Sequence, residues 1–214
     1  MKKIIFLFFF INLIFGQPPT ISLNDLWNGN YNPVRLESVR SMKNGTSYTV
    51  LETTSQKATT TVMQYDFNKV NSGTIIVSSD NLPEITSFSN YSFSKNEEKI
   101  ILETELNPIY RRSKEAIYWT YNKKNKELHK ISDNKIQEPL FSPDATKIAY
   151  VFERNLFIKD LVSQKKVQVT FDGDYKTLNG ISDWVYEEEF GFVRAFDWSP
   201  DSSALVYMRF DETK

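Results

Sequence analysis

The chain of 214 residues contains no cysteine and a single histidine, His129. Without thiols it can form neither a disulfide framework nor a thiolate metal site, and it lacks the cysteine that a bacterial lipoprotein requires. His129 lies in the lysine-rich stretch 122–130, which favours a solvated turn over a metal ligand or a catalytic base. The formal net charge is only −1, so nothing indicates nucleic acid or an anionic membrane surface as a partner. We therefore expect no metal and no cofactor.

One long apolar run stands at the start of the chain. Two lysines precede the mostly apolar residues 4–15, and a Gln-Pro-Pro sequence follows Gly16. This pattern predicts a secretory signal peptide over residues 1–16 and a mature chain over residues 17–214. A permanent membrane span needs about 20 apolar residues, so a retained membrane anchor is the less favoured alternative. We expect the mature chain to be secreted or periplasmic, or membrane-anchored if the segment stays uncleaved.

A pattern of ten residues recurs in the rest of the chain: an aromatic or apolar residue, a serine, a polar turn and a run of apolar β-formers. Its copies are residues 93–102, 141–150 and 198–207, with a weaker copy at 42–51. Proline fixes φ near −65° in such a turn, and Asp or Asn supplies the local hydrogen bonds of the bend. Each copy therefore predicts two strands joined by a tight turn. A further β-type segment follows the copies, at residues 61–66, 117–122 and 155–160.

The spacing of the copies indicates the fold. They start roughly 50 residues apart, which is typical of the four-stranded blades of a β-propeller. A β-sandwich with similar turns is the alternative, but three copies with the same order of turn and second β segment disfavour it. The sequence predicts an all-β chain that forms a partial β-propeller of roughly three to four blades.

Residues 179–190 stand outside the repeat and read Asn-Gly-Ile-Ser-Asp-Trp-Val-Tyr-Glu-Glu-Glu-Phe. An acidic run is normally a solvated face, but this one lies among Trp184, Tyr186 and Phe190, which favours partial burial. Packed carboxylates repel one another and lose hydration, and this raises their pKa unless a cation is present. A primary ammonium group has three donors and can be shared between two carboxylates. The segment is therefore suited to binding a positively charged ligand.

This segment resembles the double-glutamate motif of the dipeptidyl peptidase IV family, and the resemblance extends over essentially the whole mature chain. It implies an eight-bladed propeller in which the segment forms a short helix that projects into the central cavity. It further implies that Glu188 and Glu189 hold the free α-amine of a peptide substrate, and it implies no role for Glu187.

A second segment, residues 110–113, resembles the family's aromatic-Arg-x-Ser pattern, in which the arginine contacts a backbone carbonyl of the substrate. The resemblance makes Arg111 the candidate for this contact. A slip of one residue would exchange it with Arg112, and a plain loop at a blade edge is the other interpretation.

The resemblance implies a serine peptidase that releases X-Pro or X-Ala dipeptides from peptides with a free N-terminus. It implies a Ser–Asp–His triad on an α/β-hydrolase domain. No Gly-x-Ser-x-Gly sequence occurs here, and His129 comes too early to be the triad histidine. We therefore expect the chain to be the N-terminal propeller part of a longer protein, without the hydrolase domain and inactive alone. A homodimer of the full-length protein is a further expectation.

Two alternatives remain at this stage. The chain could be a non-catalytic periplasmic propeller that serves as an interaction module, but a scaffold has no need of two adjacent carboxylates that trap an ammonium group. It could also come from a tripeptidyl-releasing or endopeptidase relative, but such relatives alter or lack the double glutamate.

Overall fold

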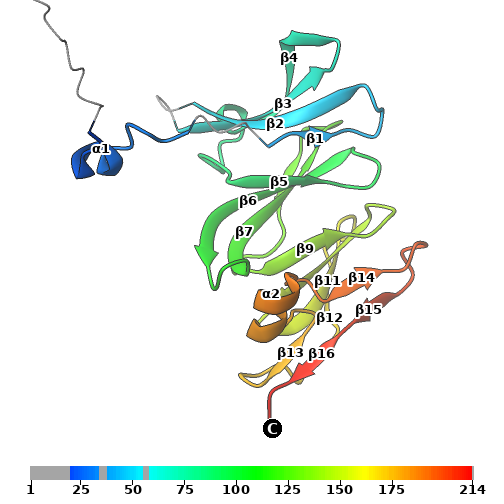
Figure 1. Ribbon diagram of the computed structural model, residues 1–214. Helices are drawn as coiled ribbons and strands as arrows, with labels where there is room; N and C mark the ends of the chain where they lie inside the picture. The colour runs from blue at the N-terminus through cyan, green and yellow to red at the C-terminus, as the bar shows by residue number, and fades with distance from the viewer. Residues whose placement is uncertain (1–19, 34–37, 55–57, 214) are drawn as a thin grey trace, which may run out of the picture. The chain divides into compact units, whose positions relative to one another are not determined.

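The computed structural model describes residues 20–33, 38–54 and 58–213 (Figure 1). The predicted signal peptide, residues 1–16, lies outside the described residues. The chain divides into two compact units, residues 1–36 and 37–214. The first contains α1 (Leu23–Trp27), a single turn capped by Ser22, whose side chain accepts a hydrogen bond from the backbone N–H of Asp25. Among the described residues, no helix has the length and apolar character needed to cross a bilayer.

The second unit consists of successive antiparallel sheets, and the first three have four strands each, paired in chain order. The first sheet comprises β1 (Arg40–Ser41), β2 (Ser47–Thr54), β3 (Thr59–Asp66) and β4 (Lys69–Ser78). A 3-10 turn, η1 (Ser79–Asn81), follows it. The second sheet comprises β5 (Asn90–Phe93), β6 (Lys99–Pro108), β7 (Lys114–Asn122) and β8 (Leu128–Lys130). The third sheet comprises β9 (Gln137–Phe141), β10 (Lys147–Phe152), β11 (Asn155–Asp160) and β12 (Lys166–Gln168).

The remaining strands form two short pairs. One pair joins β13 (Thr177–Asn179) to β16 (Arg209–Asp211), and the other joins β14 (Phe196–Trp198) to β15 (Leu205–Tyr207). The helix α2 (Trp184–Phe190) lies in the connection between β13 and β14. Sheets of four antiparallel strands that follow one another along the chain are the blades of a propeller. The predicted fold class, a partial β-propeller with a short inserted helix, is confirmed.

The recurring turns of the sequence join the first two strands of each blade, and all four copies share one backbone conformation. In each copy the fourth residue of the turn has a positive φ and donates its N–H to the carbonyl three residues earlier. These residues are Gly45, Glu97, Ala145 and Ser202. Three of the four are not glycine, so the local hydrogen bonds must offset the strain of the left-handed conformation. The weak copy at 42–51 is therefore a structural equivalent of the other three.

The same turns also link neighbouring blades. Each link joins the turn region of one blade to the turn of the next: Lys43 N–H to Glu97 Oε1 at 2.8 Å, Lys99 Nζ to the carbonyl of Ala145 at 2.7 Å, and Asp144 N–H to Ser202 Oγ at 3.0 Å. These contacts fix the blades relative to one another at the end of the strands that carries the turns.

In the part of the chain that the structure describes, the core lies between the blades and consists of three hydrophobic clusters. The central strands β6 and β10 supply residues to two clusters each, since successive side chains of a strand point to opposite faces. Ile100 and Leu102 face the first blade, whereas Ile101 between them faces the third. Burial on both faces explains why these strands read as continuous apolar runs rather than as alternating ones.

Candidate amine-binding site

Helix α2 has clear start and stop signals. Asp183 is its N-cap, and the Asp183 carboxylate accepts a hydrogen bond of 2.8 Å from the N–H of Tyr186. Gly191 ends the helix in the left-handed conformation, with φ of 74°, which glycine adopts without a steric cost. The three consecutive glutamates of the motif therefore lie in the second half of a short, capped helix.

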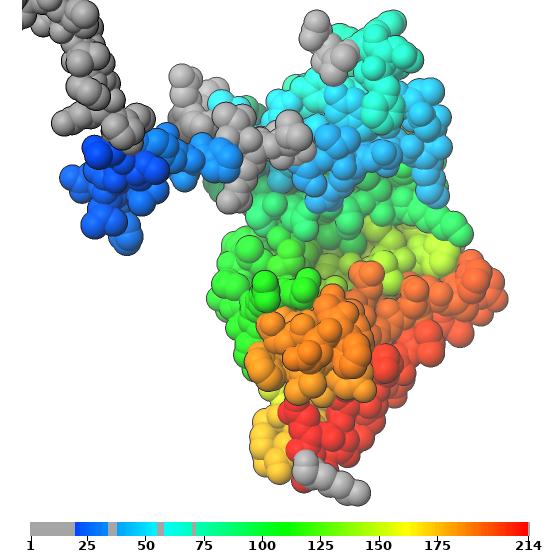
Figure 2. Space-filling model, in the orientation of Figure 1, coloured from blue at the N-terminus to red at the C-terminus, as the bar shows by residue number. Residues whose placement is uncertain are grey.

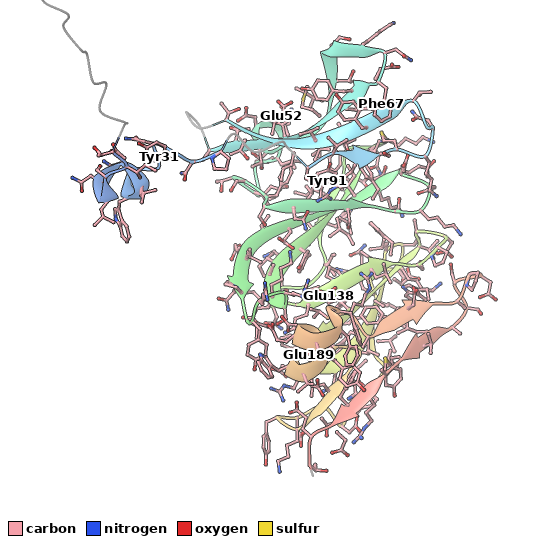
Figure 3. The ribbon with its side chains drawn as sticks, viewed as in Figure 1. Tyr31, Glu52, Phe67, Tyr91, Glu138 and Glu189 are labelled. Atoms are coloured by element: carbon pink, nitrogen blue, oxygen red, sulfur yellow. The ribbon has the colours of Figure 1, made fainter. Side chains whose placement is uncertain are left out.

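The three glutamates differ in exposure because successive residues of a helix point about 100° apart. Glu187 is buried, with 2% of its surface exposed. The Glu188 side chain is 23% exposed, and Glu189, labelled in Figure 3, is exposed. The two glutamates predicted to bind an amine are thus both accessible, and the first glutamate of the run is not.

The candidate arginine lies on the connection between β6 and β7. We call residues 109–113 the Arg loop. Arg111 extends from this loop toward α2, with its Nη1 atom 3.8 Å from Glu188 Oε2, and its side chain is 75% exposed. The structure therefore brings together two of the three predicted site residues, Arg111 and Glu188, although 76 positions separate them in the sequence. In Figure 2 the orange surface of α2 lies beside the green surface of this part of the second blade.

Arg112 lies in a different place from Arg111. Its guanidinium group is next to Gly191, where a Cβ atom would lie 3.6 Å from Arg112 Cζ. A cation at the C-terminal end of a helix interacts favourably with the helix dipole and the last carbonyl groups. The geometry therefore favours Arg111 over Arg112 as the arginine that faces a ligand beside Glu188.

Glu187, to which the sequence assigns no role, makes the shortest contacts between α2 and the Arg loop. Its Oε1 atom accepts hydrogen bonds from the backbone N–H groups of Arg112, at 2.6 Å, and Ser113, at 2.8 Å. Burial acts to raise the pKa of Glu187, but the hydrogen bonds from Ser113 and Arg112 and the Arg112 charge outweigh it, so the pKa is lowered. The sequence predicts a raised pKa for packed carboxylates. For Glu187 the pKa is lowered instead, because the Arg loop, which is distant in sequence, supplies hydrogen-bond donors.

The aromatic residues of the motif do not bury the carboxylates. Trp184 and Phe190 are 56% and 68% exposed. Tyr186 packs instead against Phe192 and Phe210, with ring centroids 5.9 and 5.0 Å apart. Glu187 is instead enclosed by residues of the Arg loop together with Leu178, Ile181 and Val193.

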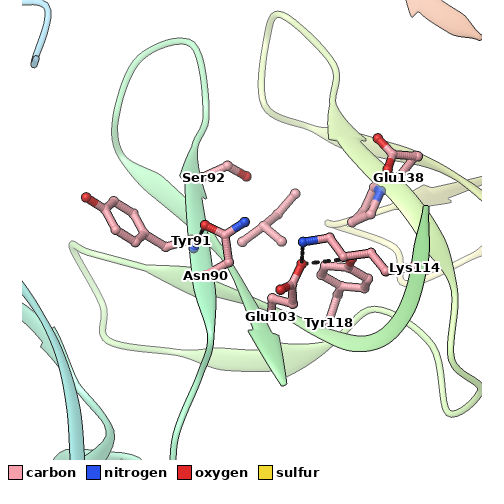
Figure 4. A pocket seen from close by; sticks show the side chains of 9 residues that line it. Asn90, Tyr91, Ser92, Glu103, Lys114, Tyr118 and Glu138 are labelled. Atoms are coloured by element: carbon pink, nitrogen blue, oxygen red, sulfur yellow. Dashed lines mark hydrogen bonds and ion pairs between the residues drawn. The ribbon is translucent and has the colours of Figure 1, made fainter. Parts of the chain in front are cut away.

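Lys114, the residue that follows the Arg loop in the chain, belongs to an ionic cluster that includes the buried Glu103 (Figure 4). Lys114, the first residue of β7, places its Nζ atom 2.6 Å from Glu103 Oε2. The Glu103 carboxylate also accepts hydrogen bonds from Ser89 Oγ, at 2.8 Å, and from the Tyr118 hydroxyl, at 3.1 Å. Across the same pocket, burial raises the pKa of Glu138, although Arg194 lies 3.9 Å away. This cluster fixes the first residue after the loop.

Comparisons with known proteins show the family and agree with the fold. A family model described as the N-terminal region of dipeptidyl peptidase IV matches residues 94–214, which is more than half of the chain. Human prolyl endopeptidase FAP is 31% identical over 201 residues, covering 87% of this chain and 26% of the relative. A probable dipeptidyl-aminopeptidase B of Podospora anserina is 37% identical over 134 residues, covering 56% of this chain and 14% of the relative.

Among solved structures, the dipeptidyl peptidase 4 of Porphyromonas gingivalis matches with a TM-score of 0.82 and 30% identity, over 91% of this chain and 28% of that chain. The fold defines the chain as blades of a β-propeller, and the matches show its family. It belongs to the dipeptidyl peptidase IV family and corresponds to the N-terminal region of that family. The chain spans about a quarter of the length of the human relative.

Proposed function

We propose that this chain forms the amine-binding part of a dipeptidyl peptidase, in which Glu188 and Glu189 bind the N-terminal ammonium group of a peptide and Arg111 binds a backbone carbonyl. The observation that carries the proposal is the meeting of Arg111 and Glu188 at 3.8 Å, from a loop and a helix on different blades. An exposed ion pair of this length contributes little to stability. The pairing is therefore better explained by ligand binding than by folding.

The proposed mechanism follows from the charges on the site. The ammonium group donates charge-assisted hydrogen bonds to the two carboxylates, while the Arg111 guanidinium donates to a carbonyl oxygen of the same peptide. Fixing the amine at one point places a peptide bond at a set distance along the chain. A nucleophile at that distance cleaves after the second residue, which gives release of dipeptides. The resemblance to the family adds Pro or Ala as that second residue.

The rest of the proposal concerns the protein of which these blades are part. We propose that an α/β-hydrolase domain supplies the Ser–Asp–His triad, that residues 1–16 direct secretion or export to the periplasm, and that the complete protein forms a homodimer. The lengths of the family's members support the first point, since this chain covers 26% of the human relative.

A binding experiment tests the amine site on the chain itself. We expect titration with Ala-Pro to shift NMR signals of α2 and the Arg loop, and titration with N-acetyl-Ala-Pro to leave them unchanged, because acetylation removes the positive charge. Glu188→Gln should abolish the shifts, whereas Glu127→Gln, on the far end of the second blade, should retain them. Equal responses to both dipeptides would refute the proposal.

A kinetic experiment tests the activity in the chain joined to its hydrolase domain. Glu188→Gln or Glu189→Gln should lower kcat/KM for a Gly-Pro reporter by about 30- to 900-fold, the equivalent of about 2–4 kcal/mol for a truncated charge pair. Arg111→Ala should lower kcat/KM strongly and Arg112→Ala much less. Near-parent activity of both glutamate variants would contradict the amine site, and the reverse order of the arginines would contradict the assignment of Arg111.

A further inference from the structure

We propose that Glu187 is a positioning residue, which sets the distance between Arg111 and the amine-binding carboxylates by holding the Arg loop against α2. This inference rests on the proposed function, because it concerns the same site. It assigns a role to the one glutamate of the run that does not face the ligand.

The contact is well suited to this role. A single carboxylate oxygen, Glu187 Oε1, accepts two backbone N–H groups of the Arg loop, at 2.6 and 2.8 Å. Hydrogen bonds to an ionised carboxylate are shorter and about twice as strong as those between neutral groups. Because the donors are backbone atoms, the contact fixes the path of the loop itself and not only a side chain.

The Arg loop is held in shape on both sides of this contact. Within the loop, the carbonyl of Ser113 accepts hydrogen bonds from the N–H groups of Ile109, at 2.9 Å, and Tyr110, at 3.3 Å. After the loop, Lys114 is paired with the buried Glu103. The loop is thus a turn closed by its own hydrogen bonds. We infer that the contact with Glu187 fixes the position of this turn relative to α2.

The other contacts between the loop and α2 are made by side chains and not by the loop backbone. The Arg112 guanidinium lies beside Gly191 at the end of α2, and Ile109 and Tyr110 are 39% and 55% exposed, so their apolar contacts are partial. The pair of Arg111 and Glu188 is long and exposed, and a substrate would compete with it for both partners. We therefore infer that Glu187 keeps Arg111 in place when a substrate ammonium group takes over Glu188.

A structural measurement tests the contact without any activity. In the 214-residue chain, amide exchange at Arg112 and Ser113 should be slow, and Glu187→Ala should accelerate it by about 10- to 100-fold, the range for lost hydrogen bonds to a charged group. Glu187→Gln keeps an acceptor oxygen and should give a smaller acceleration. The matched control is Asp183→Ala, which removes another carboxylate-to-backbone hydrogen bond of α2 but does not touch the loop. Because loss of the N-cap weakens α2 as a whole, it should accelerate the exchange of both amides much less than Glu187→Ala does.

A kinetic measurement in the chain joined to its hydrolase domain tests the role. Glu187→Ala should lower kcat/KM by about 10- to 100-fold, mainly through KM, because binding groups displaced by about 1 Å lose much of their effect. Glu187→Gln should recover part of the loss, and Asp183→Ala should show less of it than Glu187→Ala.

Three results would overturn the inference. Unchanged amide exchange in Glu187→Ala would show that the carboxylate does not hold the loop. Faster exchange with unchanged KM would show that the contact has no bearing on the site. If instead Glu188→Gln and Glu189→Gln keep full activity, the proposed function fails, and the positioning role fails with it even where the amide exchange changes as expected.

Discussion

The pairing of Lys114 with Glu103 allows a quantitative test of how the Arg loop is supported. We consider Lys114→Met, which keeps the length of the side chain and removes its charge. The Glu103 side chain is 5% exposed, so the substitution leaves a buried carboxylate without its cation. Breaking a buried pair in this way costs about 3–5 kcal/mol.

Two features of the site reduce the cost of breaking this pair. The Lys114 side chain is 28% exposed, which admits solvent to its end of the pair, and Ser89 and Tyr118 still donate hydrogen bonds to the carboxylate. We therefore expect Lys114→Met to lower the free energy of unfolding by about 2–3 kcal/mol. The double variant Glu103→Gln/Lys114→Met leaves no charge at either position. Its free energy of unfolding should therefore fall by only about 1 kcal/mol.

The assay is urea unfolding of the 214-residue chain near pH 7, with the free energy extrapolated to water. Lys124→Met, at an exposed position of the β7–β8 turn, is the control and should change stability by less than about 0.5 kcal/mol. If the double variant were as unstable as the sum of the two single variants, the two charges would not interact, and the account of the pair would be wrong.

Two further predictions concern the blades. Gly180→Ala should destabilise the chain by about 1–3 kcal/mol, because a Cβ atom there would lie 2.7 Å from the Leu156 side chain and the φ of 78° is left-handed; a thermal unfolding midpoint equal to that of the parent would refute this. The hydrogen bond from Ser142 is the main cause that lowers the pKa of Asp144 from 3.8 to about 2. Because a lowered carboxylate pKa stabilises the fold above the unfolded value, this contribution is lost as the pH falls from 3.8 towards 2. In Ser142→Ala the unfolding midpoint should therefore fall less steeply over that interval, and an unchanged slope would contradict the assignment.

The repeat could be predicted from the sequence because its information is local. Four turns share a conformation that is specified within ten residues, and the strands that follow are marked by apolar runs such as 100–102. The weak copy at 42–51 has the same turn conformation, with Gly45 in the left-handed region. The lysine-rich composition predicts a solvated turn for His129, and this is wrong for its backbone, because His129 is an exposed residue of the edge strand β8. The lysine-rich composition indicated its exposure and not its backbone conformation.

The role of Glu187 could not be predicted from the sequence for a physical reason. Its partners are the backbone N–H groups of Arg112 and Ser113, more than 70 positions earlier, and a backbone donor leaves no trace in residue identity. The choice between Arg111 and Arg112 likewise depends on the direction of two neighbouring side chains relative to α2. Adjacent residues of the same type carry no signal that distinguishes them, so this had to come from the three-dimensional arrangement.

The route of the chain between the two halves of the site has a consequence for substrate recognition. Arg111 belongs to the second blade, whereas Glu188 follows the third, so all four strands of the third blade separate them along the chain. The angle between these two blades thereby sets the distance between Arg111 and Glu188. Tyr118 and Tyr150 belong to the hydrophobic cluster between the blades, so substituting them should change that distance without changing either charged residue. If the proposed site binds a peptide amine, its width is therefore set by the packing between the second and third blades.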